Sequence, residues 1–116
     1  MLYTNLKHLE TEQETADAVQ KNENLMICCG RMGPMCLPVY AVMEGLEKTY
    51  THVTFYDQDF DIPAANFIKN LPECSSFMAL PFTVYFKNGT LAAATSGIQN
   101  KQQIEEILDR EFGRPS

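Results

Sequence analysis

The stretch "ALPFTVYFKNGTLAAAT", residues 79–95, is the part of the chain that says most about the fold. Its segment "PFTVYF" is rich in the β-branched and aromatic residues that favour strands, and "TLAAAT" follows as a second strand candidate. Asn88 and Gly89 stand between the two segments, and Asn-Gly strongly favours a tight turn between antiparallel strands. The sequence therefore predicts a β-hairpin here.

A helix is predicted directly after the hairpin. Asn100 and Gln103 have the spacing of a helix-capping pair, and Gly113 suits the C-terminal stop. Thr11 and Glu14 form the same kind of pair at the start of an earlier helix. The apolar side chains of the final helix recur at helical spacing, so that one stripe should face the core: Ile104, Ile107, Leu108 and Phe112.

The chain before the hairpin alternates between predicted strands and helices. In order, these are an edge strand within residues 1–10, a helix from Thr11 to about Lys21, a buried strand over "LMICC", a helix from near Pro34, a strand over "HVTFYD" and a short helix from Pro63. The helical side chains expected to face the core are Ala16, Val19, Val39, Val42, Met43, Leu46, Phe67 and Ile68. Such alternation implies parallel strand pairs with right-handed crossovers, and the hairpin makes the sheet mixed. We therefore expect an α/β fold with helices on both faces.

Composition narrows the functional classes. A chain of 116 residues with 45% hydrophobic content fits one domain, over residues 1–116. The formal net charge is -6 and the basic residues are scattered, which argues against nucleic-acid binding. No apolar run approaches the roughly 20 residues that a membrane helix needs, and the N-terminus lacks the pattern of a signal peptide. We expect a cytoplasmic protein that binds neither nucleic acid nor membrane.

The order of the elements and three local segments resemble the thioredoxin family. The segments are the strand, Gly-Pro turn and helix around "MGPMC", the hairpin region "ALPFTVYFKNG", and the final strand and helix "AATSGIQNKQQIEEIL". The resemblance covers nearly the whole chain from about Thr11. It implies a thioredoxin-like fold, with Pro81 as the family's cis-proline facing the active-site loop. Gly97 matches the family's glycine near the same surface, where an extended substrate segment pairs with the backbone.

The catalytic motif of that family is altered in this chain. The family has Cys-Gly-Pro-Cys at the junction of strand and helix. Matching Gly33 and Pro34 directly puts Met32 and Met35 at the two cysteine positions. Matching the apolar stripe of the helix instead puts Cys36 at the second position and Gly33 at the first. We favour the second register, because burial of several side chains constrains the register more than two loop residues do. A nucleophilic cysteine is missing in either register.

Other features of the family's active site are also missing. The strand position of its buried carboxylate holds Met26 or Ile27, and the chain contains no tryptophan. These differences indicate altered chemistry.

One interpretation keeps thiol-disulfide chemistry. Cys36, in the first helical turn, would be the reactive thiol, with Cys29 as its partner across the loop and Arg31 adding positive charge nearby. The substrates would be oxidised proteins or small-molecule thiols and disulfides that dock near Pro81. This chemistry needs no metal and no cofactor.

The alternative is a binding or assembly module without catalysis. A surface formed by Met32, Gly33, Pro34, Met35, Leu80 and Pro81 would bind an extended peptide of a protein partner through backbone pairing and adaptable methionine contacts.

A third interpretation is a soft-metal site formed by Cys28, Cys29, Cys36, Met32 and Met35. The adjacent strand residues Cys28 and Cys29 should point to opposite faces, which argues against it. Cys28, on a central strand, is expected to be a core residue. Cys74, in the loop ahead of Pro81, is expected to be an incidental thiol.

Overall fold

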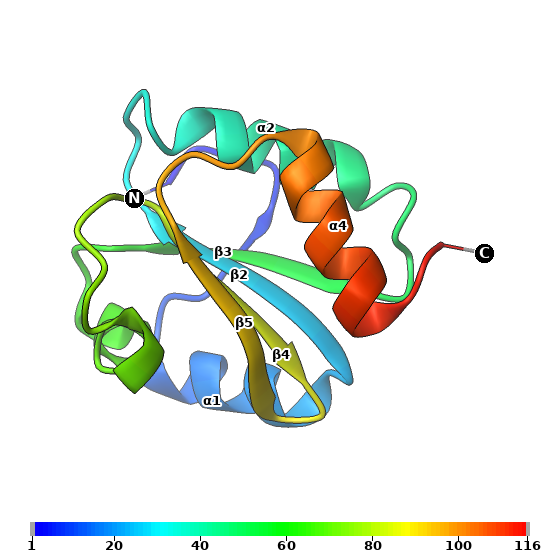
Figure 1. The fold of residues 1–116 in the computed structure, drawn as a ribbon. Coiled ribbons are helices and arrows are strands. Elements are labelled where there is room, and N and C mark those ends of the chain that lie inside the picture. Colours follow the sequence, from blue (N-terminus) through cyan, green and yellow to red (C-terminus); the bar gives the residue numbers. More distant parts are fainter. Residues whose placement is uncertain (1, 116) are drawn as a thin grey trace.

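A five-stranded sheet in the order β1-β3-β2-β4-β5 forms the centre of the molecule in the computed structural model, which describes residues 2–115 (Figure 1). Met1 and Ser116, the ends of the predicted single domain, lie outside the described residues. The strands are β1 (Lys7–His8), β2 (Asn24–Gly30), β3 (Thr54–Asp59), β4 (Phe82–Lys87) and β5 (Thr90–Ser96). The first three are parallel to one another, while β4 pairs antiparallel with β2 and β5. The predicted mixed sheet is confirmed.

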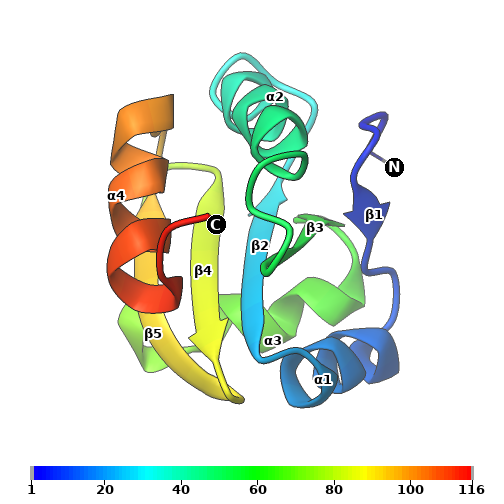
Figure 2. The ribbon, with the colours of Figure 1, turned by 90° about the vertical axis from the view of Figure 1, so that its right-hand side faces the viewer.

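Helices cover both faces of this sheet (Figure 2). The elements are α1 (Glu12–Lys21), α2 (Leu37–Leu46), α3 (Asn66–Lys69) and α4 (Lys101–Phe112), with short 3-10 turns η1 (Pro63–Ala65) and η2 (Pro72–Cys74). Helices α2 and α4 lie on one face, and α1 and α3 lie on the other. None of the helices within residues 2–115 has the length and apolar character needed to cross a membrane.

The central strand β2 is buried on both faces and divides the core in two. Met26 and Cys28 pack with the side chains of α2 and α4, whereas Leu25, Ile27 and Cys29 pack with those of α1 and α3. This follows from the pleat of a strand, which sends successive side chains to opposite sides. Each cysteine of β2 therefore belongs to a different half of the core.

The predicted turn and helix caps are present. Asn88 and Gly89 have φ values of 51° and 82°, the left-handed conformation that a two-residue hairpin turn requires. The Asn100 side chain accepts a hydrogen bond from the backbone of Gln103 at 2.8 Å, and the Gln103 side chain accepts one from the backbone of Asn100 at 2.8 Å. Thr11 and Glu14 make the same reciprocal pair.

Two elements begin two or more residues later than predicted. Helix α2 begins at Leu37, later than Pro34, because residues 34–36 form a turn in which the Cys36 N–H bonds to the Gly33 carbonyl at 3.1 Å. Strand β3 begins at Thr54, because the preceding residues form turns after α2.

Two side chains also differ from the prediction. Ala16 is only half-buried, since α1 faces the core through Thr15, Ala18 and Val19. Phe67 is on the surface, because the four-residue α3 turns only Ile68 inward.

Candidate functional site

Cys36 lies where β2 passes into α2, and its side chain packs against the end of β2. It is the N-cap residue of α2, and only 2% of its surface is exposed. A Cβ added at Gly30 would lie 2.8 Å from Cys36 Sγ, 2.7 Å from the Tyr40 hydroxyl and 3.0 Å from Pro81 Cβ. Because real Cβ atoms do not approach other atoms so closely, Gly30 is the residue that lets these three side chains converge.

Two hydrogen bonds that involve the Arg31 backbone hold the loop above Gly30. The Arg31 backbone N–H donates to Cys36 Sγ at 3.4 Å, and the Tyr40 hydroxyl donates to the Arg31 carbonyl at 3.1 Å. Burial raises the pKa of the Tyr40 hydroxyl, so it remains a donor at neutral pH. The Arg31 guanidinium, expected to support Cys36, forms a bidentate pair with exposed Asp61 at 2.8 and 2.9 Å. Its charge is therefore already paired.

The Pro81 loop lies against the same point. The Leu80-Pro81 peptide bond is cis, Pro81 is buried, and Leu80 is half-buried. Gly97, at a φ of 84°, donates its N–H to the carbonyls of Ala79 and Pro81 at 3.1 and 3.0 Å. The two residues that the resemblance placed together, Pro81 and Gly97, are thus in direct backbone contact.

Most of the large exposed apolar side chains lie at this end of the sheet. Loops 31–36 and 75–81 lie at this end of the sheet (Figure 1). Loop 31–36 also meets the N-terminal segment, whose Tyr3 N–H contacts Met32 Sδ at 3.4 Å. Of seven such side chains within residues 2–115, five belong to these loops, to the first residue of α2 or to the residue after Gly97, with 38% to 97% of their surface exposed. We call these five the apolar end surface: Met32, Met35, Leu37, Met78 and Ile98.

The four cysteines divide between the two halves of the core. Cys28 and Cys36 share the half under α2 and α4, while Cys29 and Cys74 share the half next to α1 and α3. The structure does not bring together Cys29 and Cys36, the pair expected from the sequence, because the Cys29 side chain points through the opposite face of the sheet. The cysteine on the face of Cys36 is Cys28, which was expected to be core alone.

Burial also sets the chemistry of the strand thiols. It raises the pKa of Cys28 well above its ordinary value and the pKa of Cys29 to about 12. Burial likewise raises the pKa of Cys74. These three thiols remain protonated at neutral pH, and the thiolate is the nucleophilic form. All four cysteines are free, and within residues 2–115 no group of three or more His, Cys, Asp or Glu side chains is arranged to hold a metal ion.

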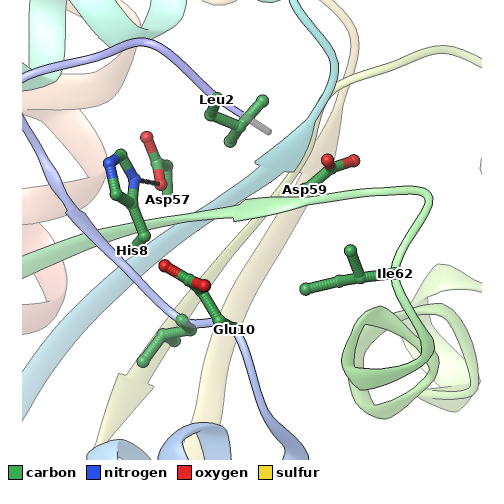
Figure 3. A pocket seen from close by; sticks show the side chains of 7 residues that line it. Leu2, His8, Glu10, Asp57, Asp59 and Ile62 are labelled. Carbon is green, nitrogen blue, oxygen red and sulfur yellow. Dashed lines mark hydrogen bonds and ion pairs between the residues drawn. The ribbon is translucent and has the colours of Figure 1, made fainter.

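A buried carboxylate that the sequence did not predict lies beside this half of the core. Asp57 stands opposite Cys28 in the β2–β3 ladder and is fully buried. Its carboxylate accepts a hydrogen bond from Thr4 and is 2.5 Å from His8 Nδ1 (Figure 3). Burial raises the pKa of Asp57, and the bonds to Thr4 and His8 oppose the rise. Asp57 lies within β3.

Asp57 and His8 line a cavity of about 240 Å³ at the sheet edge (Figure 3). Its wall is part apolar and part acidic, formed by Leu2, His8, Leu9, Glu10, Asp57, Asp59 and Ile62.

We compared the chain with known protein families, curated proteins and solved structures. Neither a family model nor a curated protein sequence matches the chain. Thioredoxin from Fasciola hepatica superposes with a TM-score of 0.77 at 20% identity, over 91% of this chain and 99% of that one. Thioredoxin from Plasmodium falciparum gives 0.75 at 20% identity, over 90% and 98%. Mitochondrial thioredoxin 3 from Saccharomyces cerevisiae gives 0.72 at 24% identity, over 90% and 94%. The chain has a thioredoxin fold.

Proposed function

We propose that this chain is a binding or assembly module that recognises an extended apolar segment of a partner protein on the apolar end surface. The observation that carries the proposal is the gathering of five exposed apolar side chains at one end of the sheet. Exposed apolar patches mark interaction sites, and methionine, with its flexible and polarizable side chain, adapts to varied partners. Three of the five residues are methionines: Met32, Met35 and Met78.

The state of the thiols supports binding over dithiol catalysis. Cys36 is covered, and Cys29, the expected partner, packs in the other half of the core. A dithiol catalyst needs one accessible thiolate and a second thiol able to reach it. Methionine at positions 32 and 35 cannot replace either, since a thioether forms no disulfide.

The chemistry of the partner follows from the surface and the charge. An extended segment with small or aliphatic side chains suits this surface, where it would pair with the backbone beside Pro81. Because the chain carries a net charge of -6, neutral or basic residues flanking that segment favour encounter. Free thiols suit a reducing compartment, so we assign the chain to the cytoplasm.

A single-thiol redox function is the second candidate, and one observation favours it. Cys36 lies at the N-terminus of α2, and its sulfur accepts a hydrogen bond from the Arg31 N–H. Both features direct positive electrostatic potential at the Cys36 sulfur. Cys36 would then exchange with a disulfide of a protein or a small molecule bound beside Pro81.

Selection from a library of displayed random peptides, followed by affinity measurement, tests these candidates. Met35→Glu and Met78→Glu should each lower the affinity for the selected peptides at least tenfold, about 1.4 kcal/mol. Phe67→Glu is the matched control, because it adds the same charge at an exposed apolar residue on α3, away from this surface. Cys36→Ala should leave peptide affinity within twofold of the parent. Equal affinity for the Met35→Glu and Phe67→Glu variants would refute the binding module. Capture that depends on Cys36 and is reversed by reductant would establish the single-thiol function instead.

A further inference from the structure

We propose that Cys28 and Cys36 form an intramolecular disulfide when the chain meets a low-molecular-weight disulfide such as oxidised glutathione. This modification differs from the pair expected from the sequence, and it is independent of whether the apolar end surface binds a peptide. It rests on the positions of the two side chains relative to β2.

The Cys28 side chain points to the face of the sheet on which Cys36 lies. Cys28 and Gly30 are two residues apart on β2, so their side-chain directions point to the same face of the sheet. Cys36 Sγ lies 2.8 Å from the position that a Gly30 Cβ would occupy. The sulfur of Cys36 therefore sits over the next same-face position along the strand from Cys28.

No side chain of β2 separates the two thiols on that face. The only same-face residue between Cys28 and the strand end is Gly30, which has no side chain. Cys28 Sγ has a weak contact of 3.8 Å from the Thr83 hydroxyl, and Cys36 Sγ has the 3.4 Å contact from the Arg31 N–H. Neither contact is strong enough to prevent reorientation.

Formation of the disulfide requires the two cysteines to move closer together. A disulfide requires Cα atoms within about 7 Å and sulfurs at about 2 Å. Closure therefore requires the turn at residues 34–36 to open transiently, which breaks the 3.4 Å contact between the Arg31 N–H and Cys36 Sγ. Cys29 has no such route, because it lies on the other side of the sheet with Cys74.

The reaction proceeds in two exchange steps. Cys36 thiolate attacks one sulfur of oxidised glutathione, the S–S bond breaks, and one glutathione leaves as a thiolate that takes up the proton lost by Cys36. The Cys28 thiol then loses its proton and the thiolate attacks Cys36 Sγ, and the second glutathione leaves as a thiolate that takes up this proton. The protein loses two electrons and two protons, and oxidised glutathione becomes two reduced molecules.

Burial sets the order of these steps. It raises the pKa of Cys28, and the neighbouring Cys36 raises it further. Cys28 therefore does not start the exchange. Cys36 reacts first, when the turn that covers it opens to glutathione, so the disulfide forms as a single oxidation of the chain and not as a catalytic cycle.

Peptide mapping of the folded, full-length chain tests the pair. The chain is incubated with oxidised glutathione over a series of redox buffers, quenched with acid, alkylated and digested with trypsin without reduction. Cys28 and Cys29 fall in peptide 22–31, Cys36 in peptide 32–48 and Cys74 in peptide 70–87, so each pair of linked peptides has a distinct mass. Fragmentation of the cross-linked peptide distinguishes Cys28 from Cys29, so the test does not depend on a variant that folds.

The proposal expects a cross-link between peptides 22–31 and 32–48, assigned to Cys28. It should persist in Cys29→Ala, the matched control on the adjacent residue, and disappear in Cys28→Ala and Cys36→Ala. Circular dichroism checks that each variant folds. A cross-link assigned to Cys29, a cross-link to Cys74 alone, or glutathione left on Cys36 with no cross-link at any potential would each overturn it.

Discussion

The hairpin and final helix (β4, β5 and α4) contrast with the segment that joins β2 to α2. In the first region every element was predicted with its boundaries nearly correct, because turn and capping residues act within a few positions of one another. In the second, the sequence allowed two registers and placed the start of α2 too early. Short-range signals specify elements well, but a functional loop depends on what packs against it from distant parts of the chain.

The largest effect that this comparison predicts lies in the well-specified region. Ile104 is fully buried near the start of α4, so Ile104→Ala should lower the free energy of unfolding by about 2–5 kcal/mol through lost burial and an unfilled cavity. Urea denaturation measures the loss. Gln102→Ala, on the exposed side of the same helix, is the control and should stay within about 0.5 kcal/mol. A loss below about 1 kcal/mol for Ile104→Ala would mean that α4 contributes little to the core.

An intermediate effect is expected at the junction of β2 and α2. Gly30→Ala puts a methyl group against Cys36, Tyr40 and Pro81, so it should cost about 1–3 kcal/mol by overpacking. Gly33→Ala in the same loop meets no atom within 4 Å, and should change stability by about 0.5 kcal/mol or less.

Thermal and urea unfolding measure the stability of both glycine variants against that of the parent chain. Adding Cys36→Ala to Gly30→Ala removes one of the three close contacts and should recover part of the loss. If Gly30→Ala proves as harmless as Gly33→Ala, the loop moves freely and the convergence at Gly30 does not constrain it.

The smallest of the three effects concerns the cap of α4. Asn100→Ala removes the acceptor for the Gln103 N–H and should destabilise the chain by about 1 kcal/mol. Asn100→Asp keeps an acceptor oxygen, and its unfolding midpoint in urea should match that of the parent. An equal loss in both variants would show that the amide nitrogen, and not the cap bond, matters at this position.

The candidate site was predictable only in part. Met32, Pro34 and Met35 are exposed as a binding surface requires, and Pro81 and Gly97 lie in contact. The partner of Cys36 was not predictable, because the sequence gives the alternation of side chains along β2 but not the face over which α2 folds. Asp57 was missed for a similar reason, since only the pairing of β1 with β3 brings His8 and Thr4 to it.

The sequence by itself determined the α/β class, the hairpin at Asn88-Gly89, both capping boxes and the buried character of β2. All of these follow from residues close to one another in the chain, where turn conformation, capping and period-two burial are decided. Only the tertiary structure decided that Cys36 shares a face with Cys28, and that Gly30 leaves room for Tyr40 and Pro81. These contacts join segments from separate elements, and their geometry depends on how helices pack across the sheet.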